Sequence, residues 1–170
     1  MRALVIACAM LCATALPTQV MPRLGAETLA GQRIVLPHEL AAVSVLVAGY
    51  TKESRKQTEP WVRRLREEAR IAGKATVYEV AILDGVPSFI RGMILRQMRS
   101  GVSAARQKEY LVVTENVETW RSLLGPTGDD DACILLMRTN GVVLWRTHGP
   151  VNDGAFEALI RNGLSSSGAP

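Results

Sequence analysis

Thiols and imidazoles, the side chains that act most readily as nucleophiles or metal ligands near neutral pH, are few in this chain. The cysteines are Cys8, Cys12 and Cys133, and the histidines are His38 and His148. A thiolate can attack a disulfide, whereas a zinc or copper site needs three or four clustered ligands. Cys8 and Cys12 belong to an apolar leader, so Cys133 is the one thiol of the remaining chain. The sequence therefore predicts neither an internal disulfide nor a metal site.

The chemistry open to Cys133 depends on its surroundings. It stands in the apolar run Ala132–Met137 (ACILLM), which is typical of a buried strand. Burial among apolar side chains raises the pKa of a thiol and suppresses its reactivity. We therefore expect Cys133 to be a core residue, with a single-cysteine redox protein as the alternative.

Hydroxyl and carboxylate groups offer little more. Thr51 and Ser54 have no base near them in the sequence, although a nucleophilic hydroxyl needs one. Asp129–Asp131 (DDD) lacks the spaced loop and distal glutamate of an EF-hand, so we expect a solvated turn there. No phosphate-binding glycine pattern and no hydrolase motif is present. The sequence predicts no catalytic residue, metal or cofactor. The alternative is an unrecognised enzyme in which a hydroxyl such as that of Thr51 or Ser54 contacts a base that is distant in the sequence.

The N-terminus has the features of an export signal. Arg2 precedes the apolar run Ala3–Ala15, which is shorter than the roughly 20 residues that a membrane span needs. Ala13–Ala15 (ATA) offers the small residues of a cleavage site, and Leu24–Ala26 (LGA) is a second candidate. We expect residues 1–26 to be the signal peptide and short leader of an exported, periplasmic protein, or a membrane anchor if the leader is retained.

Length and composition favour one globular domain. The chain has 170 residues, of which 48% are hydrophobic and 21% are charged. We expect the domain to cover residues 27–164 and residues 165–170 to form a flexible tail. The formal net charge of +4 is compatible with an acidic partner or a membrane surface, but it is too small to indicate nucleic-acid binding.

Hydrophobic patterns predict alternating strands and helices along this domain. The expected strands are a first ribbon at 29–37, buried strands at 42–49 and 76–83, a short edge strand at 109–114, and a hairpin of 132–138 and 142–146. The expected helices cover 56–72, 86–100 and 117–124, and a last helix ends at 161. Buried strands with a helical crossover between the first two predict an α/β fold.

Individual residues predict how several of these elements begin, end and pack. Gly73 is expected to stop the first helix, and Asn116 to cap the third through its side chain. Asn152 or Asp153 would cap the last helix, and Asn140-Gly141 favours a type I′ turn in the hairpin. Six apolar residues of the second helix recur at helical spacing: Val86, Phe89, Ile90, Met93, Ile94 and Met98.

The order of strand, helix, strand, helix, hairpin and helix resembles the thioredoxin-like superfamily over residues 31–164. Where redox members carry Cys-x-x-Cys, this chain has Gly49–Ser54 (GYTKES), and where they carry a cis-proline it has Asp129–Ala132 (DDDA). The resemblance implies a central mixed β-sheet with helices on both faces and a C-terminal β-hairpin plus helix. Because both hallmarks of the redox site are missing, it also implies a non-redox branch.

Three segments resemble a cysteine-poor branch of this superfamily, the mitochondrial ATP synthase assembly-factor family and its bacterial relatives. They are the tryptophan-bearing Gln57–Leu65, the arginine-rich Arg91–Arg106 and the hairpin Ile134–Gly149. This resemblance implies a non-catalytic accessory or assembly role, in which the protein binds another protein. A membrane complex is one such partner that the resemblance implies.

The expected docking surface combines two regions. One is the loop that carries Thr51 and Ser54. The other is a basic set on and after the second helix: Arg91, Arg96, Arg99, Arg106 and Lys108. A charged helix face is most often simply solvated, but clustered arginines also bind acidic protein segments or anionic lipid through bidentate contacts. We therefore expect a protein partner and leave open a peripheral contact with a membrane.

Overall fold

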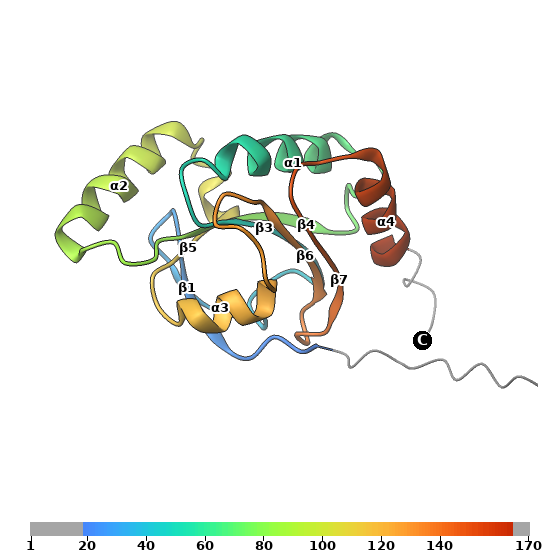
Figure 1. Ribbon diagram of the computed structural model, residues 1–170, viewed down its shortest axis with the longest axis horizontal. Coiled ribbons are helices and arrows are strands. Elements are labelled where there is room, and N and C mark those ends of the chain that lie inside the picture. The colour runs from blue at the N-terminus through green and yellow to red at the C-terminus, as the bar shows by residue number, and fades with distance from the viewer. Residues whose placement is uncertain (1–18, 165–170) are drawn as a thin grey trace, which may run out of the picture.

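The computed structural model describes residues 19–164 (Figure 1). Cys8, Cys12, the first cleavage site at 13–15 and the tail at 165–170 lie outside the described residues. No helix among residues 19–164 is both long enough and apolar enough to cross a membrane.

One seven-stranded mixed sheet forms the centre of the molecule (Figure 1). Its strands are β1 (Leu24–Thr28), β2 (Arg33–Leu36), β3 (Val43–Gly49), β4 (Thr76–Ile82), β5 (Tyr110–Val113), β6 (Cys133–Arg138) and β7 (Val143–His148). Their order is β2-β1-β5-β4-β3-β6-β7, in which β3, β4 and β5 are parallel and the remaining pairs are antiparallel. Helix α1 (Arg55–Glu67) supplies the crossover that the parallel pair β3–β4 requires. The predicted α/β class is confirmed.

Helices on both faces of the sheet give the molecule two apolar cores (Figure 1). Successive residues of a strand point to opposite faces, so β3 contributes to both cores. Val47 belongs to the core that holds Trp61 of α1 and Phe156 of α4 (Asp153–Leu164). Leu46 belongs to the opposite core, which holds Trp120 of α3 (Val117–Leu124).

Two strand predictions are wrong in detail. The strand predicted at an edge, β5, lies inside the sheet between β1 and β4, and the edges are β2 and β7. The single ribbon predicted at 29–37 is part of a hairpin, β1–β2, whose first strand buries Leu24 and Ala26. Val20 also bridges to Val142, so residues expected in the leader add to the sheet. Both differences arise because β1 inserts beside β5, a contact between segments far apart in the chain.

The helix ends agree with the predictions only in part. Helix α1 ends at Glu67 instead of 72, because Glu68 is extended and the following turn buries Ile71 in the core. Asn116 is left-handed (φ 56°) and makes no side-chain cap, so that prediction is wrong. Asn152 does cap α4, since its Oδ1 accepts the Ala155 N–H at 2.9 Å.

The predicted hairpin forms between β6 and β7, but its turn is not of type I′. Gly141 has a φ of 88°, whereas Asn140 does not adopt a positive φ. The Gly141 N–H donates to the Arg138 carbonyl at 2.9 Å, and the register shifts between Leu136 and Met137. One glycine in the left-handed region together with a bulged register is typical of hairpin loops longer than the two residues of a type I′ turn.

Helix α2 (Ser88–Gly101) is the largest departure from the sequence-based expectation. It projects from one end of the molecule beyond α1 (Figure 1), and none of its residues is buried. Phe89 is 82% exposed and Met93 is 63% exposed, while Ile90, Ile94 and Met98 are half-buried. The six apolar residues that recur at helical spacing therefore do not form one buried face, because only the side of α2 turned toward the sheet is partly covered.

Candidate functional site

The loop Gly49–Ser54 leads from the end of β3 into α1 and takes the place of the Cys-x-x-Cys sequence. Ser54 is 1% exposed, and its hydroxyl donates to the Thr51 carbonyl at 2.7 Å. Gly49 is required beneath it, because a Cβ there would overlap the Ser54 hydroxyl. The Thr51 hydroxyl accepts the Ser54 N–H at 3.0 Å and donates to Asp130 Oδ1 at 2.7 Å. Both hydroxyls therefore hold the loop in shape.

The Thr51–Asp130 contact brings a hydroxyl and a carboxylate together, which the enzyme alternative requires. A carboxylate activates a hydroxyl poorly unless its pKa is raised toward neutrality. Neither His38 nor His148 hydrogen-bonds to this pair, and the His148 Nε2 instead lies 2.7 Å from the Leu124 carbonyl oxygen. The pair thus has the geometry of a loop anchor and lacks the partner that would make the hydroxyl nucleophilic.

The aspartate turn before β6 is tied to α1. Asp131 accepts hydrogen bonds from Gln57 Nε2 at 3.2 Å and from the Thr127 hydroxyl at 3.1 Å, and these bonds lower the pKa of its carboxyl group. Ala132 ends the segment expected in the place of the cis-proline, and it donates its N–H to Gln57 Oε1 at 3.1 Å. A proline has no N–H and would break this bond. Within residues 19–164, no three His, Cys, Asp or Glu side chains gather closely enough to hold a metal ion.

The single thiol of the described chain is buried at the start of β6, as predicted. Burial is the main cause that raises the pKa of the Cys133 thiol to about 11. Only about one thiol in ten thousand is then ionised at pH 7, whereas disulfide exchange requires the thiolate. The arrangement offers no accessible thiolate near the loop.

Tyr50 packs against the same core as Cys133. Burial raises the pKa of Tyr50 to about 12, and its hydroxyl has no hydrogen-bond partner among the described residues. The Arg121 guanidinium lies 4.6 Å from the centre of its ring and also binds Asp129 at 2.7 Å. Sequence analysis missed Arg121, and no local signal could have found it, because its partners come from distant segments.

The basic set predicted for docking does not form one free patch. Arg99 donates to the Leu29 carbonyl at 2.7 Å, Arg91 donates to the Val86 carbonyl at 3.4 Å, and Arg106 binds Glu79 at 2.6 Å. Arg96 is exposed and makes no hydrogen bond or ion pair with another described residue. Three of the four arginines thus hold local structure, and Arg96 is left to solvent.

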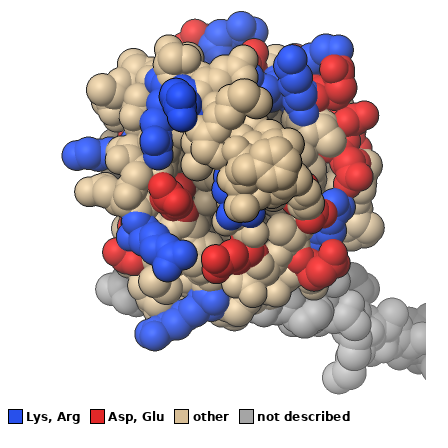
Figure 2. Space-filling view, turned by 90° about the vertical axis from the view of Figure 1, so that its left-hand side faces the viewer, with Lys and Arg blue, Asp and Glu red and all other residues tan. Residues whose placement is uncertain are grey.

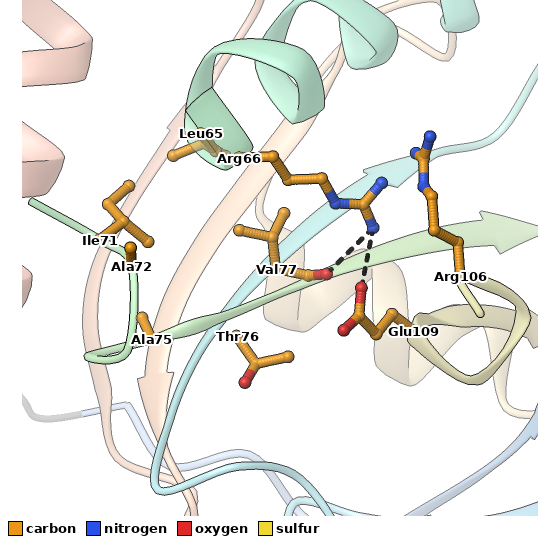
Figure 3. A pocket seen from close by; sticks show the side chains of 9 residues that line it. All are labelled: Leu65, Arg66, Ile71, Ala72, Ala75, Thr76, Val77, Arg106 and Glu109. Atoms are coloured by element: carbon orange, nitrogen blue, oxygen red, sulfur yellow. Dashed lines mark hydrogen bonds and ion pairs between the residues drawn. The ribbon is translucent and has the colours of Figure 1, made fainter. Parts of the chain in front are cut away.

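Arg106 lies at a pocket of about 310 Å³ between the end of α1 and β4 (Figure 3). Arg66 reaches into this pocket and donates to Glu109 Oε2 at 3.2 Å and to Glu79 Oε1 at 3.1 Å. Figure 3 shows Arg66 directed toward Glu109 and the Val77 carbonyl, with apolar residues on the opposite wall. Because two arginines meet two glutamates, the charges balance and the network serves the fold.

A second pocket, of about 410 Å³, connects the two regions predicted for docking. Thr51 and Ser54 of the loop lie on one side of it, and Ile94 and Met98 of α2 lie on another. Its floor is the sheet face that carries Val47 and Ala81, and we call it the α2 pocket. The structure thus brings the loop and α2 together around a cavity, although Ser54 itself is buried.

The comparisons with known proteins agree with this architecture. No family model and no curated protein sequence matches the chain. Among solved structures, a thioredoxin-family thiol:disulfide interchange protein from Chlorobium tepidum has a TM-score of 0.55 and 14% identity over 89% of this chain and 99% of its own. The thioredoxin domain of a thiol-disulfide oxidoreductase from Bacteroides vulgatus has a TM-score of 0.58 and 14% identity over 88% and 99%.

BsSco, a member of the Sco family of cytochrome c oxidase assembly proteins, also has a TM-score of 0.58, with 10% identity over 89% of this chain and 96% of its own. These similarities show that the chain has a thioredoxin-like fold. They lend no support to the narrower resemblance to the ATP synthase assembly-factor family. At such low identity these similarities show the fold alone.

Proposed function

We propose that this chain is a non-catalytic thioredoxin-like protein that binds another protein as an accessory or assembly factor. The observation that carries the proposal is the uncovered outer side of α2, where Phe89 and Met93 are both largely exposed. They are four residues apart and therefore adjacent on one helix face. A large aromatic side chain beside methionine is typical of protein interaction surfaces and costs solubility when left uncovered.

The charges of α2 indicate the kind of partner. Arg96 lies on the same face, one turn beyond Met93, and makes no hydrogen bond or ion pair with another described residue. The helix contains three arginines and no acidic residue, so two copies of α2 would repel each other. Figure 2 looks at the end of the molecule from which α2 projects, and uncharged atoms occupy its middle with both basic and acidic side chains around them. An acidic partner segment complements this surface.

The loop contributes less to the proposed surface than to its support. Thr51 and Lys52 line the pocket beneath α2, on the side away from Phe89 and Met93, and Ser54 is buried. The burial of Cys133 and its raised pKa support a function without thiol chemistry. The leader sequence supports export to the periplasm, where the partner would be a membrane complex or one of its subunits. The alternative is that the exposed pair Phe89 and Met93 contacts the membrane itself.

Photocrosslinking in the producing cell tests the proposal. The full chain would carry benzoylphenylalanine in place of Met93, and a matched protein would carry it in place of the exposed Arg63 of α1. We expect one discrete covalent protein adduct at position 93 and none at position 63. Arg96→Glu in the same chain should lower the adduct yield by about tenfold, because it reverses the charge that an acidic partner meets.

Equal adducts at both positions, or adducts to lipid alone at position 93, would contradict the protein-binding function. Reduction of insulin disulfides by the purified protein, lost in Cys133→Ala, would contradict its non-catalytic character and favour the single-cysteine redox alternative.

A further inference from the structure

The inner side of α2 lies over a cavity, unlike its exposed outer side. Because no residue of α2 is buried, the helix does not close onto the sheet, and the α2 pocket of about 410 Å³ remains beneath it. This volume lies in the range of small-molecule sites. Small residues line this space, since Ala81 lies on the sheet side and Gly101 ends the helix side. Small residues on both the sheet wall and the helix wall therefore leave this pocket unfilled.

Most of the lining is apolar. Val47 and Ala81 come from the central strands β3 and β4, Val86 precedes α2, and Ile94 and Met98 come from its inner face. Transfer of a hydrocarbon chain from water onto such walls is favourable, because it removes apolar surface of both partners from water. The occupant that these walls favour has an extended apolar part.

The one carboxylate of the lining is already neutralised. Glu79 accepts from Arg66 at 3.1 Å and from Arg106 at 2.6 Å, so its charge faces two guanidinium groups outside the pocket. No other acidic side chain lines the α2 pocket. The site accordingly offers no free carboxylate to a cationic ligand.

The charged side chains that remain in the lining, Lys52 and Arg55, are both basic. Lys52 makes no ion pair or hydrogen bond within residues 19–164, and Arg55 shares its charge with the exposed Glu59. The Tyr110 hydroxyl also has no hydrogen-bond partner among the described residues, and burial raises the pKa of Tyr110 to about 12, so this hydroxyl remains a donor at neutral pH. Arg55 opens the first turn of α1, which carries no acidic residue, and the positive end of the helix dipole adds to the attraction for an anion.

We propose that the α2 pocket binds a single-chain amphiphile with a carboxylate head, that is, a fatty acid. The chain lies between the inner face of α2 and the sheet, and the carboxylate meets Lys52 and Arg55. This site is separate from the proposed protein-docking surface, because Phe89, Met93 and Arg96 lie on the opposite side of the helix. Either site can therefore fail without the other.

Calorimetric titration of the protein, purified from cells that express the full chain and stripped of lipid, tests this site. The probes are dodecanoate and dodecyltrimethylammonium, which have the same chain and opposite head charges. We expect saturable binding of one dodecanoate per protein and at least about tenfold weaker binding of the ammonium compound, because the free charges of the pocket are positive.

Three variants locate the ligand. Lys52→Glu should weaken dodecanoate binding by about tenfold, whereas Arg63→Glu, an equal charge reversal on the exposed side of α1, should leave it unchanged. Ala81→Leu fills the floor of the pocket and should abolish binding. The circular dichroism spectrum and the midpoint of thermal unfolding show whether Ala81→Leu has folded, and Lys52→Glu keeps the test decisive if it has not.

Equal affinity for both probes, equal effects of Lys52→Glu and Arg63→Glu, or the absence of one-to-one binding would overturn the proposal. Binding to phosphatidylglycerol vesicles without binding of dodecanoate would overturn it as well, because the contact would then be a membrane surface. Crosslinking at position 93 should persist in Lys52→Glu, and this separates the present site from the proposed function.

Discussion

Asp131 exemplifies how single side chains hold the region between β3, α1 and β6. Its carboxylate joins Gln57 of α1 to Thr127 and the Gly128 N–H, while Gln57 in turn accepts the Ala132 N–H. Redox members of the fold have thiols and a cis-proline in this region. Here amide, hydroxyl and carboxylate groups form a set of hydrogen bonds that stabilises the loop.

The substitution Asp131→Asn should lower the free energy of unfolding at pH 7, because one amide oxygen replaces two carboxylate oxygens that accept these bonds. The hydrogen bond from Gln57, followed by that from Thr127, lowers the pKa of Asp131 in the folded state. Its stabilising contribution is therefore complete above the unfolded pKa, about 3.9, and is lost as the pH falls through the lower folded value. Urea unfolding at pH 7, 5 and 3 measures the difference between the two proteins.

The matched control is Glu67→Gln, which changes an exposed carboxylate without a hydrogen-bond partner among the described residues. The Asp131→Asn deficit should shrink below about pH 4, and the Glu67→Gln protein should follow the parent. A deficit that stays constant from pH 7 to pH 3 would show that the hydrogen bonds do not depend on the carboxylate charge.

Cys133 should resist alkylation in the native protein. Its side chain is buried and the pKa of its thiol is raised to about 11, so reaction requires local opening as well as ionisation. We expect maleimide labelling at pH 7 to be at least about 100-fold slower than in denaturant. Thr51→Cys serves as a control with a more accessible thiol. Labelling of native Cys133 as fast as that of this control would contradict the prediction and favour the single-cysteine redox alternative.

At the scale of the elements, the β6–β7 hairpin depends on one backbone position. Gly141 has a φ of 88°, and a Cβ there would lie 2.9 Å from the Met21 carbonyl oxygen. Met21 belongs to the segment before β1, and its N–H donates to the Gly141 carbonyl at 2.8 Å. The turn therefore joins the C-terminal hairpin to the start of the described chain.

Gly141→Ala should lower the free energy of unfolding by about 1–3 kcal/mol, because alanine is strained at this φ and its Cβ contacts backbone that cannot move freely. Gly92→Ala is the control, since Gly92 lies in α2 with no atom within 4 Å of an added Cβ. Alanine should favour that helix by about 0.5–1 kcal/mol. Chemical denaturation of both variants gives the comparison, and equal effects would mean that the turn tolerates a side chain.

At the scale of the whole molecule, stability is distributed unevenly. β3 and β6 lie between two cores, and Trp61 of α1 joins this centre to the C-terminal segment by donating its Nε1–H to the Gly149 carbonyl at 2.9 Å. Helix α2 has no buried residue and lies at the periphery (Figure 1). Local opening costs least where few apolar contacts are lost.

Amide hydrogen exchange should therefore separate the helices. We expect the α2 amides to exchange at least about tenfold faster than those of the centre of α1, while β3, β4 and β6 exchange slowest. Mass spectrometry of peptic peptides resolves these segments. Protection of α2 equal to that of α1 in the isolated protein would show that α2 belongs to the cooperative core, and would weaken the case for an uncovered docking surface.

Sequence alone was sufficient for features that depend on neighbouring residues. Continuous apolar runs predicted the central strands and the C-terminal hairpin, and an apolar stripe at helical spacing predicted the crossover helix. The apolar neighbours of Cys133 predicted its burial. The absence of a thiol in Gly49–Ser54 is a direct reading of the chain. Such features require no knowledge of which distant segments meet.

Tertiary structure decided what depends on contacts across the chain. The insertion of β1 beside β5 makes β5 an internal strand, and the Thr51–Asp130 bond joins residues 79 positions apart. The same apolar periodicity produced a buried face in α1 and an uncovered one in α2, because burial depends on whether a sheet lies beneath the helix and periodicity carries no information about that. The exposed Phe89 and the α2 pocket therefore emerged only from the assembled fold.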